Sequence, residues 1–279
     1  MNKMIHQNTL PIEFNMNDIT IVTAFFDIGR GEWTPDKGLP HYLQRTNDTY
    51  FERFAEMAKL DNDMVVYTSA DFEDRIKALR GDKPTQIVVV DFKTSFNELR
   101  DSVSKIQKDP KFQEIINPSQ VKNPEYWNAD YVVVNLLKAT FVNRAISMNM
   151  VHTDLAAWLD FGYCREPHNT TRWTYPFTKR KIHFFNIKDW KEGTYIKDVI
   201  ANNDVHITGP CIVADKEMWP YLETLVHHNI QELFKHNLID DDQTLLLMSY
   251  LAAPEMFELH KVSPDNWFVA FKEYNENLS

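Results

Sequence analysis

One stretch limits what this chain can fold into more than any other: Leu155-Ala156-Ala157-Trp158-Leu159-Asp160-Phe161-Gly162. Five apolar residues lead into a carboxylate, and a glycine follows two positions later. A short apolar run bounded in this way is typical of a strand buried inside a sheet. Ligands of open α/β sheets bind at the carboxyl ends of such strands, which is where Asp160 would lie. Taken alone, the stretch favours an Asp that caps the next turn over an Asp that binds a ligand.

The first half of the chain alternates predicted strands with predicted helices. Runs of β-branched and aromatic residues predict strands at 19–26, 64–68 and 86–91, and helical spacing predicts helices at 41–60 and 71–80. This alternation favours a parallel, Rossmann-like sheet. The first strand ends in Asp27-Ile28-Gly29-Arg30-Gly31, which matches neither the G-x-G-x-x-G dinucleotide loop nor a P-loop.

A long helix is predicted at 128–149, directly before the opening stretch. Its apolar residues cover nearly all of its circumference, so we expect it to be buried. Asn135 and Lys138 are three positions apart and therefore share one face. A lysine on a buried helix either extends its ammonium to water or meets an anion, and the sequence does not decide between these alternatives.

The second half is less regular. Between Arg165 and Phe185, five basic residues alternate with aromatic ones, which fits a solvated hairpin with an aromatic underside better than a substrate groove. A strand interrupted by Gly209-Pro210 is predicted at 204–213, a helix at 216–236, and two closing strands at 257–261 and 267–271. Asp240-Asp241-Asp242-Gln243 opens a further helix. Capping explains one or two of these carboxylates, whereas three are more than a cap needs.

Composition narrows the setting in which the chain can act. The net charge of −10 makes general nucleic-acid binding through a basic surface implausible. With Cys164 and Cys211 as its two cysteines, the chain offers no disulfide framework, which fits a reducing compartment. Met1 to Asn17 lacks the apolar core of a secretory signal, and no apolar run approaches the ~20 residues of a membrane span. We therefore expect a cytoplasmic protein, with peripheral contact at the inner membrane left open.

Several of these segments together resemble the HtrL/YibB-like family of bacterial proteins, which is related to WlaTC-type proteins found among genes for surface polysaccharide assembly. The resemblance rests on five segments that span nearly the whole chain in order: Val22 to Arg30, Val65 to Thr68, Asn135 to Ala139, Trp158 to Gly162 and Asp241 to Thr244. It implies an α/β, Rossmann-like fold of the glycosyltransferase A type (GT-A), with a mostly parallel central sheet flanked by helices and a small β-rich C-terminal portion. It also implies one domain, with a nucleotide-sugar-binding half at about 19–160 and an acceptor-binding half at about 161–279.

The resemblance further implies a set of site residues. The nucleotide-sugar donor would be bound by residues at strand ends and on the long helix: Thr23, Ala24, Phe25, Asp27, Arg30, Ser69, Lys138, Trp158, Asp160 and Gly162. Thr208 and Gly209 would line the acceptor loop. Asp242, with Asp241 as its rival, would act as general base or position the sugar, and Gln243 would hydrogen-bond donor or acceptor.

A divalent metal, Mn²⁺ or Mg²⁺, would neutralise the donor diphosphate in such a transferase, because hard cations prefer carboxylate oxygens. Related transferases end this strand in W-x-D-x-D, but here Gly162 replaces the second Asp. Asp160 is therefore a candidate ligand that lacks its usual neighbour. His260 is the candidate for the missing ligand, and an ordinary strand histidine is the alternative.

The leading hypothesis is a transferase that moves a hexose from a nucleotide sugar, expected to be UDP-linked, to a lipid-linked glycan or lipopolysaccharide intermediate. The alternative is a non-catalytic glycan-binding or assembly protein on a degenerate transferase fold, because Gly162 stands where related transferases have a second Asp. A nucleotidyltransferase ranks lower, because its Gly-rich, Lys-containing N-terminal loop is absent.

Overall fold

A seven-stranded sheet forms the centre of the computed structural model, which describes residues 17–276. The strands are β1 (Ile19–Phe25), β2 (Met64–Thr68), β3 (Thr85–Val89), β4 (Leu155–Leu159), β5 (Ile182–Asn186), β6 (Ile207–Asp215) and β7 (Phe257–Lys261). Their order across the sheet is β3-β2-β1-β4-β6-β5-β7. Strand β6 runs antiparallel to both of its neighbours, and the other pairs are parallel. The predicted Rossmann-like α/β fold with a mostly parallel sheet is therefore confirmed.

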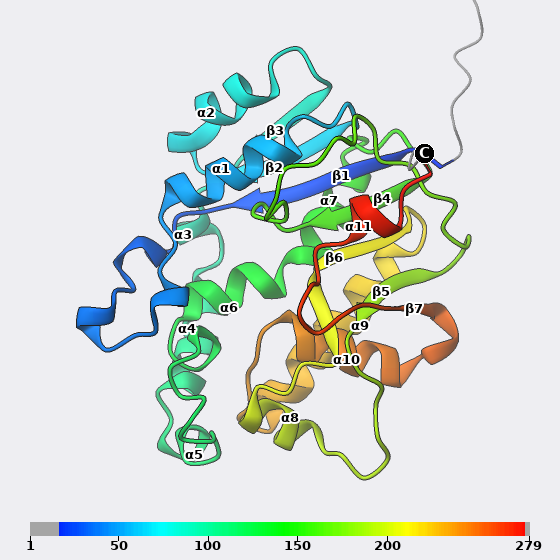
Figure 1. Cartoon of the computed structure of the whole chain (residues 1–279). Coiled ribbons are helices and arrows are strands. Elements are labelled where there is room, and N and C mark those ends of the chain that lie inside the picture. The colour runs from blue at the N-terminus through cyan, green and yellow to red at the C-terminus, as the bar shows by residue number, and fades with distance from the viewer. Residues whose placement is uncertain (1–16, 277–279) are drawn as a thin grey trace, which may run out of the picture.

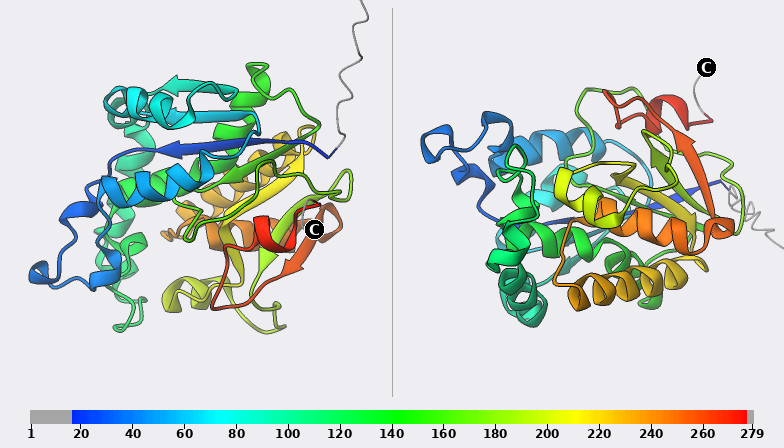
Figure 2. Two further views of the ribbon diagram at one scale, coloured as in Figure 1. Left: turned by 45° about the horizontal axis from the view of Figure 1, so that its top comes forward. Right: turned by 90° about the horizontal axis from the view of Figure 1, so that it is seen from below.

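Helices cover both faces of the sheet, so the chain forms three layers (Figures 1 and 2). One face packs against α1 (Asn47–Met57), α2 (Ala70–Arg80) and α11 (Ala270–Glu273). The opposite face packs against a larger set of helices. Its main members are α4 (Asn97–Gln107), α6 (Ala129–Leu136), α7 (Lys138–Ser147), α8 (Ile196–Asn202), α9 (Trp219–Lys235) and α10 (Asp242–Ala252), with the short α3 (Phe92–Ser95) and α5 (Pro110–Gln113) beside them.

The central strands are apolar because both of their faces are covered. Every residue of β1, β2 and β4 is buried, and successive side chains enter opposite apolar layers. The carboxyl ends of β1 and β4 lie side by side, since Val22 pairs with Trp158 in a parallel register. This register brings the residues after Phe25 and after Leu159 to one edge of the sheet.

The helix predicted at 128–149 is divided at Leu137 into α6 and α7. Asn128 caps the first part by accepting a hydrogen bond from the amide of Tyr131 at 2.8 Å. The division places Lys138 at the first position of α7. A cation is unfavourable at a helix N-terminus because of the macrodipole, so carboxylates must offset its charge there.

Other boundaries also differ from the predictions. The segment His41–Leu43 forms a 3-10 turn, and α1 begins only after Thr46, whose hydroxyl accepts from the Thr49 amide. The strand expected at 267–271 is wrong, because Ala270 begins α11 and Phe271 packs against Trp173. Short apolar runs do not distinguish a strand from a buried helical turn. The C-terminal half contains α8, α9 and α10 beside β5, β6 and β7, so it is mixed rather than β-rich.

No helix within residues 17–276 has both the length and the apolar character that a membrane crossing needs. The lead-in from Met1 to Asn17, in which no secretory signal is expected, lies outside the described residues except for Asn17.

Candidate functional site

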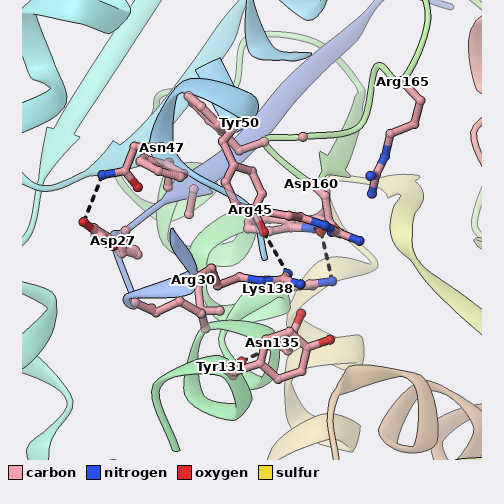
Figure 3. Close-up of a pocket in the computed structure, with 18 residues that line it drawn as sticks. Asp27, Arg30, Arg45, Asn47, Tyr50, Tyr131, Asn135, Lys138, Asp160 and Arg165 are labelled. Atoms are coloured by element: carbon pink, nitrogen blue, oxygen red, sulfur yellow. Dashed lines mark hydrogen bonds and ion pairs between the residues drawn. The ribbon is translucent and has the colours of Figure 1, made fainter. Parts of the chain in front are cut away.

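A pocket opens at the sheet edge where β1 and β4 end (Figure 3). Its walls come from the loop after β1, the start of α1, the facing sides of α6 and α7, and the loop after β4. Most of the predicted donor-binding residues line it: Ala24, Phe25, Asp27, Arg30, Lys138, Trp158, Asp160 and Gly162. The predicted crevice at the carboxyl ends of the strands is thus present in the structure.

Lys138 joins two carboxylates at the bottom of this pocket. Its Nζ lies 2.9 Å from Oδ1 of Asp160 and 2.8 Å from Oδ2 of Asp242, and it also donates to the carbonyl of Gly209 at 3.1 Å. Lys138 and Asp242 are buried, whereas the Asp160 carboxylate is 39% exposed. The Lys138 ammonium therefore does not extend to water. It contacts two anions, the carboxylates of Asp160 and Asp242.

Burial by itself lowers the pKa of Lys138, but attraction to Asp160 and Asp242 outweighs it, so the net pKa is raised. The lysine consequently stays an ammonium at neutral pH. Asp160 is further fixed by Trp158, whose indole Nε1 donates to Oδ1 at 2.8 Å. The second oxygen of Asp160, Oδ2, carries neither of these two bonds.

Gly209 is what allows Asp242 to approach the lysine. The β5–β6 register shifts between Phe184 and Phe185, because three residues of β6, Gly209, Pro210 and Cys211, bulge between their partners Thr208 and Ile212. A Cβ atom on Gly209 would lie 1.8 Å from Oδ2 of Asp242, which no real contact allows. On its other side, β6 keeps its regular register with β4, and the Pro210 carbonyl accepts from the Asp160 amide at 2.9 Å.

Arg30 is built into the wall rather than aimed into open space. Its guanidinium donates to the Tyr50 hydroxyl at 2.8 Å and to the Leu43 carbonyl, and it lies over the ring of Trp33 at 5.0 Å. Asp27 is exposed and accepts from the Gly29 amide and, at 2.9 Å, from the Asn47 side chain. Figure 3 shows both the Arg30–Tyr50 and the Asp27–Asn47 contacts. These bonds fix the loop after β1 against α1.

Part of the lining was not predicted from the sequence. Arg45, Asn47, Tyr50 and Tyr131 line the pocket, and so does Arg165, which belongs to the segment expected to be a solvated hairpin. Asn47 and Tyr50 are three apart on the first turn of α1, a spacing that could have signalled a shared face. Nothing local distinguishes Arg45 or Arg165 from ordinary surface arginines.

Other predicted residues lie outside this lining. Thr23 is fully buried in β1, and Ser69 precedes α2 at the end of β2. Thr208 donates its hydroxyl to the Phe185 carbonyl inside the sheet. Asp241 caps α10 and accepts from the amide of Gln243 at 3.0 Å, so both belong to the helix start.

The structure explains the three consecutive carboxylates. Asp240 accepts from the Asp241 amide at 2.9 Å and from the Thr244 hydroxyl at 2.6 Å, and Asp241 is the cap. Capping thus accounts for Asp241, hydrogen bonds within the same turn account for Asp240, and Asp242 is the one that pairs with Lys138. Asp242 lies behind the lysine rather than on the pocket surface.

His260 does not meet Asp160. It lies in β7, three strands away from β4, and packs against Phe185 and Tyr274 on the face covered by α1, whereas Asp160 turns toward Lys138 on the opposite face. Its neighbours are His183, whose Nδ1 is 2.9 Å from Nε2 of His260, and Glu258. One ligand atom from each of these three residues falls within 4.8 Å of the others, so they form a group that could hold a metal ion.

A divalent ion at Asp160 does not fit the residues around it. Gly162 removes the second carboxylate, and Oδ1 of Asp160 already faces the Lys138 ammonium and the Trp158 indole. Hard cations require several oxygen ligands, and a neighbouring ammonium repels them. We therefore derive no step through a metal at this position.

Comparison with known proteins gives a family match and a close relative. A family profile described as "Bacterial protein of unknown function (HtrL_YibB)" matches residues 17–276. "Protein HtrL" of Escherichia coli (strain K12) is 42% identical over 265 residues, which cover 92% of this chain and 93% of that protein.

Two solved structures are similar at a lower level. Mouse xyloside xylosyltransferase 1 in its apo form has a TM-score of 0.42 at 11% identity, covering 87% of this chain and 85% of that one. The 4-diphosphocytidyl-2C-methyl-D-erythritol synthase of Anaerococcus prevotii DSM 20548 has a TM-score of 0.38 at 11% identity, covering 89% and 90%. Likenesses of this size carry no argument about function.

The buried ion pair gives a first testable prediction. Lys138→Met should lower the free energy of unfolding by about 3–5 kcal/mol, because it leaves Asp242 buried without a counter-charge. Adding Asp242→Leu should restore part of the loss, since both charges are then gone. Urea unfolding measures both variants. Lys261→Met, which breaks the exposed pair with Asp189, is the control and should cost less than ~1 kcal/mol.

Gly209→Ala should destabilise the protein by about 1–3 kcal/mol or more, since the added methyl group would overlap the Asp242 carboxylate. The matched control is Gly31→Ala, where the new Cβ would meet its nearest neighbour at 3.8 Å. Thermal unfolding of the two variants is the measurement. Equal melting temperatures would show that the β6 bulge does not depend on this glycine.

A third prediction concerns Glu125, which is buried near Asp240. Burial, followed by repulsion from Asp240, raises the pKa of Glu125 from 4.5 to about 8. Between these values the folded protein holds a proton that the unfolded chain has released, so stability falls as the pH rises through this window. Glu125→Gln should reduce that fall, measured by urea unfolding at pH 5 and pH 8. The exposed Glu114→Gln is the control and should leave the pH dependence unchanged.

Proposed function

The chain belongs to the HtrL/YibB family of bacterial proteins, and from this premise we propose that it transfers a hexose from a nucleotide-linked donor to a cell-surface glycan or lipopolysaccharide intermediate. The family description assigns no activity, so the site itself must support the proposal. The observation that carries it is the pocket at the ends of β1 and β4, where arginines surround a carboxylate held by a buried lysine.

Each part of a nucleotide sugar finds a matching chemical group in this pocket. Arg45 and Arg165 offer planar donors suited to phosphoryl oxygens. The rings of Tyr50 and Tyr131 offer flat surfaces for a nucleobase or a sugar face. Asp160 offers a carboxylate oxygen for sugar hydroxyls. The donor chosen for a first test is a UDP-hexose, as the family resemblance suggests.

Within this proposal, Asp160 and Lys138 have different roles. Oδ2 of Asp160 accepts a hydrogen bond from a hydroxyl of the donor sugar or the acceptor. Lys138 holds the other oxygen, which fixes the direction of the carboxylate before the substrate arrives. Asp242 keeps the lysine in place from behind. The half of the chain before Asp160 would hold most of the donor, with Arg165 joining it from the other half, and the rest of that half would contribute to the acceptor side.

A non-catalytic glycan-binding protein on a degenerate transferase fold is the second candidate. Two observations favour it: Gly162 replaces a carboxylate, and Asp242 is buried instead of lining the pocket. Such a protein would bind an acceptor glycan and consume no nucleotide sugar. The same assay therefore separates the two functions.

The test is a screen of nucleotide sugars with the full-length protein, following melting temperature and release of nucleoside diphosphate. We expect at least one UDP-hexose to raise the melting temperature and to be consumed. Asp160→Asn should reduce consumption by about 100-fold or more, the scale of losing one contact that acts in the transition state. The exposed Asp265→Asn is the control and should match the parent protein. A screen without any binding or turnover would refute the proposal.

A further inference from the structure

Three arginines gather beside the pocket without a carboxylate partner. Arg45 and Arg165 line the pocket, and Arg53 lies behind Gly162, where its Cδ is 3.5 Å from the position of a Cβ on that glycine. Within residues 17–276, none of the three forms a salt bridge. The Nη1 atom of Arg53 is also buried without a hydrogen-bond partner among the described residues. A buried donor in this state is costly unless a ligand satisfies it.

Different segments bring these cations together. Arg45 precedes α1, Arg53 lies within α1, and Arg165 follows the Gly162 turn after β4. Their charges affect one another, because the pKa of Arg165 is lowered by burial and then by repulsion from Arg45 and Arg53. Figure 3 shows Arg45 and Arg165 both directed toward the region of Asp160. An anion placed between them would relieve this repulsion.

The position of the missing carboxylate is filled. A Cβ on Gly162 would meet the Tyr50 ring at 3.1 and 3.3 Å and the Arg53 side chain at 3.5 Å. The glycine therefore does more than omit an acid, because its small size lets α1 bring Tyr50 and Arg53 to the sheet edge. At the position where a metal-dependent site would carry a second carboxylate, this chain has the side-chain carbons of Arg53.

The charge balance around the pocket also favours an anion over a cation. Five cations (Arg30, Arg45, Arg53, Lys138 and Arg165) face three carboxylates (Asp27, Asp160 and Asp242). Lys138 and the two acids on either side of it are already paired with one another. The four arginines carry four positive charges, against one on Asp27 and one net negative charge on the Lys138 group. The balance is therefore positive and lies on the arginines, which suits a group bearing a negative charge on each phosphoryl unit.

We infer that Arg45 and Arg165 bind the diphosphate of the nucleotide-linked donor, that Arg53 adds positive charge from behind Gly162, and that the three together take the place of a divalent cation. This inference rests on the proposed function. In the transfer, the bond between the anomeric carbon and the β-phosphate oxygen breaks, and its electron pair leaves with the nucleoside diphosphate. The acceptor oxygen forms the new bond to that carbon and releases its proton to a base or to solvent. The three guanidinium groups stabilise the charge on the departing diphosphate.

Calorimetric titration of the full chain with UDP, UMP, uridine and inorganic pyrophosphate, in EDTA and in Mn²⁺, tests this inference. We expect UDP to bind in EDTA within about twofold of its affinity in Mn²⁺. Arg45→Gln and Arg165→Gln should each weaken UDP by roughly 10- to 100-fold, the range for a hydrogen bond between charged groups. Arg53→Gln, which removes a charge behind the lining, should weaken UDP less. Binding of uridine should be unaffected. Arg144→Gln, at an exposed arginine in the last turn of α7, is the control.

The outcomes separate this inference from the proposed function. UDP binding that requires Mn²⁺ and ignores the three substitutions would overturn the arginine assignment and leave the transferase proposal intact. Pyrophosphate that binds as tightly as UDP, with the same arginine dependence, would support the anion site and contradict the nucleotide donor. Binding of neither anion would overturn both. Arg53→Lys keeps the charge at this half-buried position. If it recovers part of the UDP affinity lost in Arg53→Gln, the loss reflects charge and not folding.

Gly162→Asp gives a second, independent arm. The new carboxylate would lie beside Arg53 and cancel part of the positive charge, so UDP affinity in EDTA should fall. Gly162→Ala controls for the tight contact with Tyr50 and should retain more of the affinity. Unchanged UDP binding in the Asp variant would contradict a role for charge at this position.

Discussion

The ammonium of Lys138, held between Asp160 and Asp242, is the interaction on which the site depends. It connects α7, the end of β4, the bulge of β6 and the start of α10, which are far apart in the sequence. Burial penalises each charge alone, and only the complete group repays that penalty. The lysine also stands at a helix N-terminus, where the macrodipole adds to its cost, so the two carboxylates must offset both effects. Asp160 is thus directed by Lys138, which is held in turn by Asp242 and Gly209, two residues outside the pocket lining.

Two glycines shape this region by what they leave room for. Gly209 admits the carboxylate of Asp242 through a bulge, and Gly162 admits Tyr50 and Arg53 from α1. Neither needs a positive backbone angle, so steric space, not backbone freedom, is the reason for glycine at both positions. In a chain with 7 glycines, both sit directly beside charged side chains of the same site. The space at Gly209 lets Asp242 pair with Lys138, and the space at Gly162 lets Arg53 bring positive charge beside the pocket.

Residues at the centre of the pocket were predictable from the sequence, whereas those at its rim were not. Strands β1, β2 and β4 were predictable because buried parallel strands are apolar runs, and Asp160 followed from its place at the end of one. Arg45 and Arg53 were not, because a loop and the polar side of a helix carry arginines for many reasons. The face to which His260 points depends on a strand register that no local pattern fixes. The division of the long helix at Leu137 was likewise invisible, since its apolar residues continue across the break.

The net charge of −10 makes the position of the arginines informative. An acidic protein surface repels a nucleotide diphosphate at long range, so affinity for such a ligand must come from a local positive region. Where side chains exclude water, salt screens the field of that region only weakly. Arginines that pair with nearby carboxylates would cancel that field, and the three beside Gly162 have no such partner among the described residues. Their mutual repulsion destabilises the empty protein slightly, and an anion removes it on binding. If the proposed function holds, the same feature that weakens the fold without a ligand favours the ligand. On that proposal, the unpaired cations support a binding site at this edge of the sheet more firmly than Asp160 does alone.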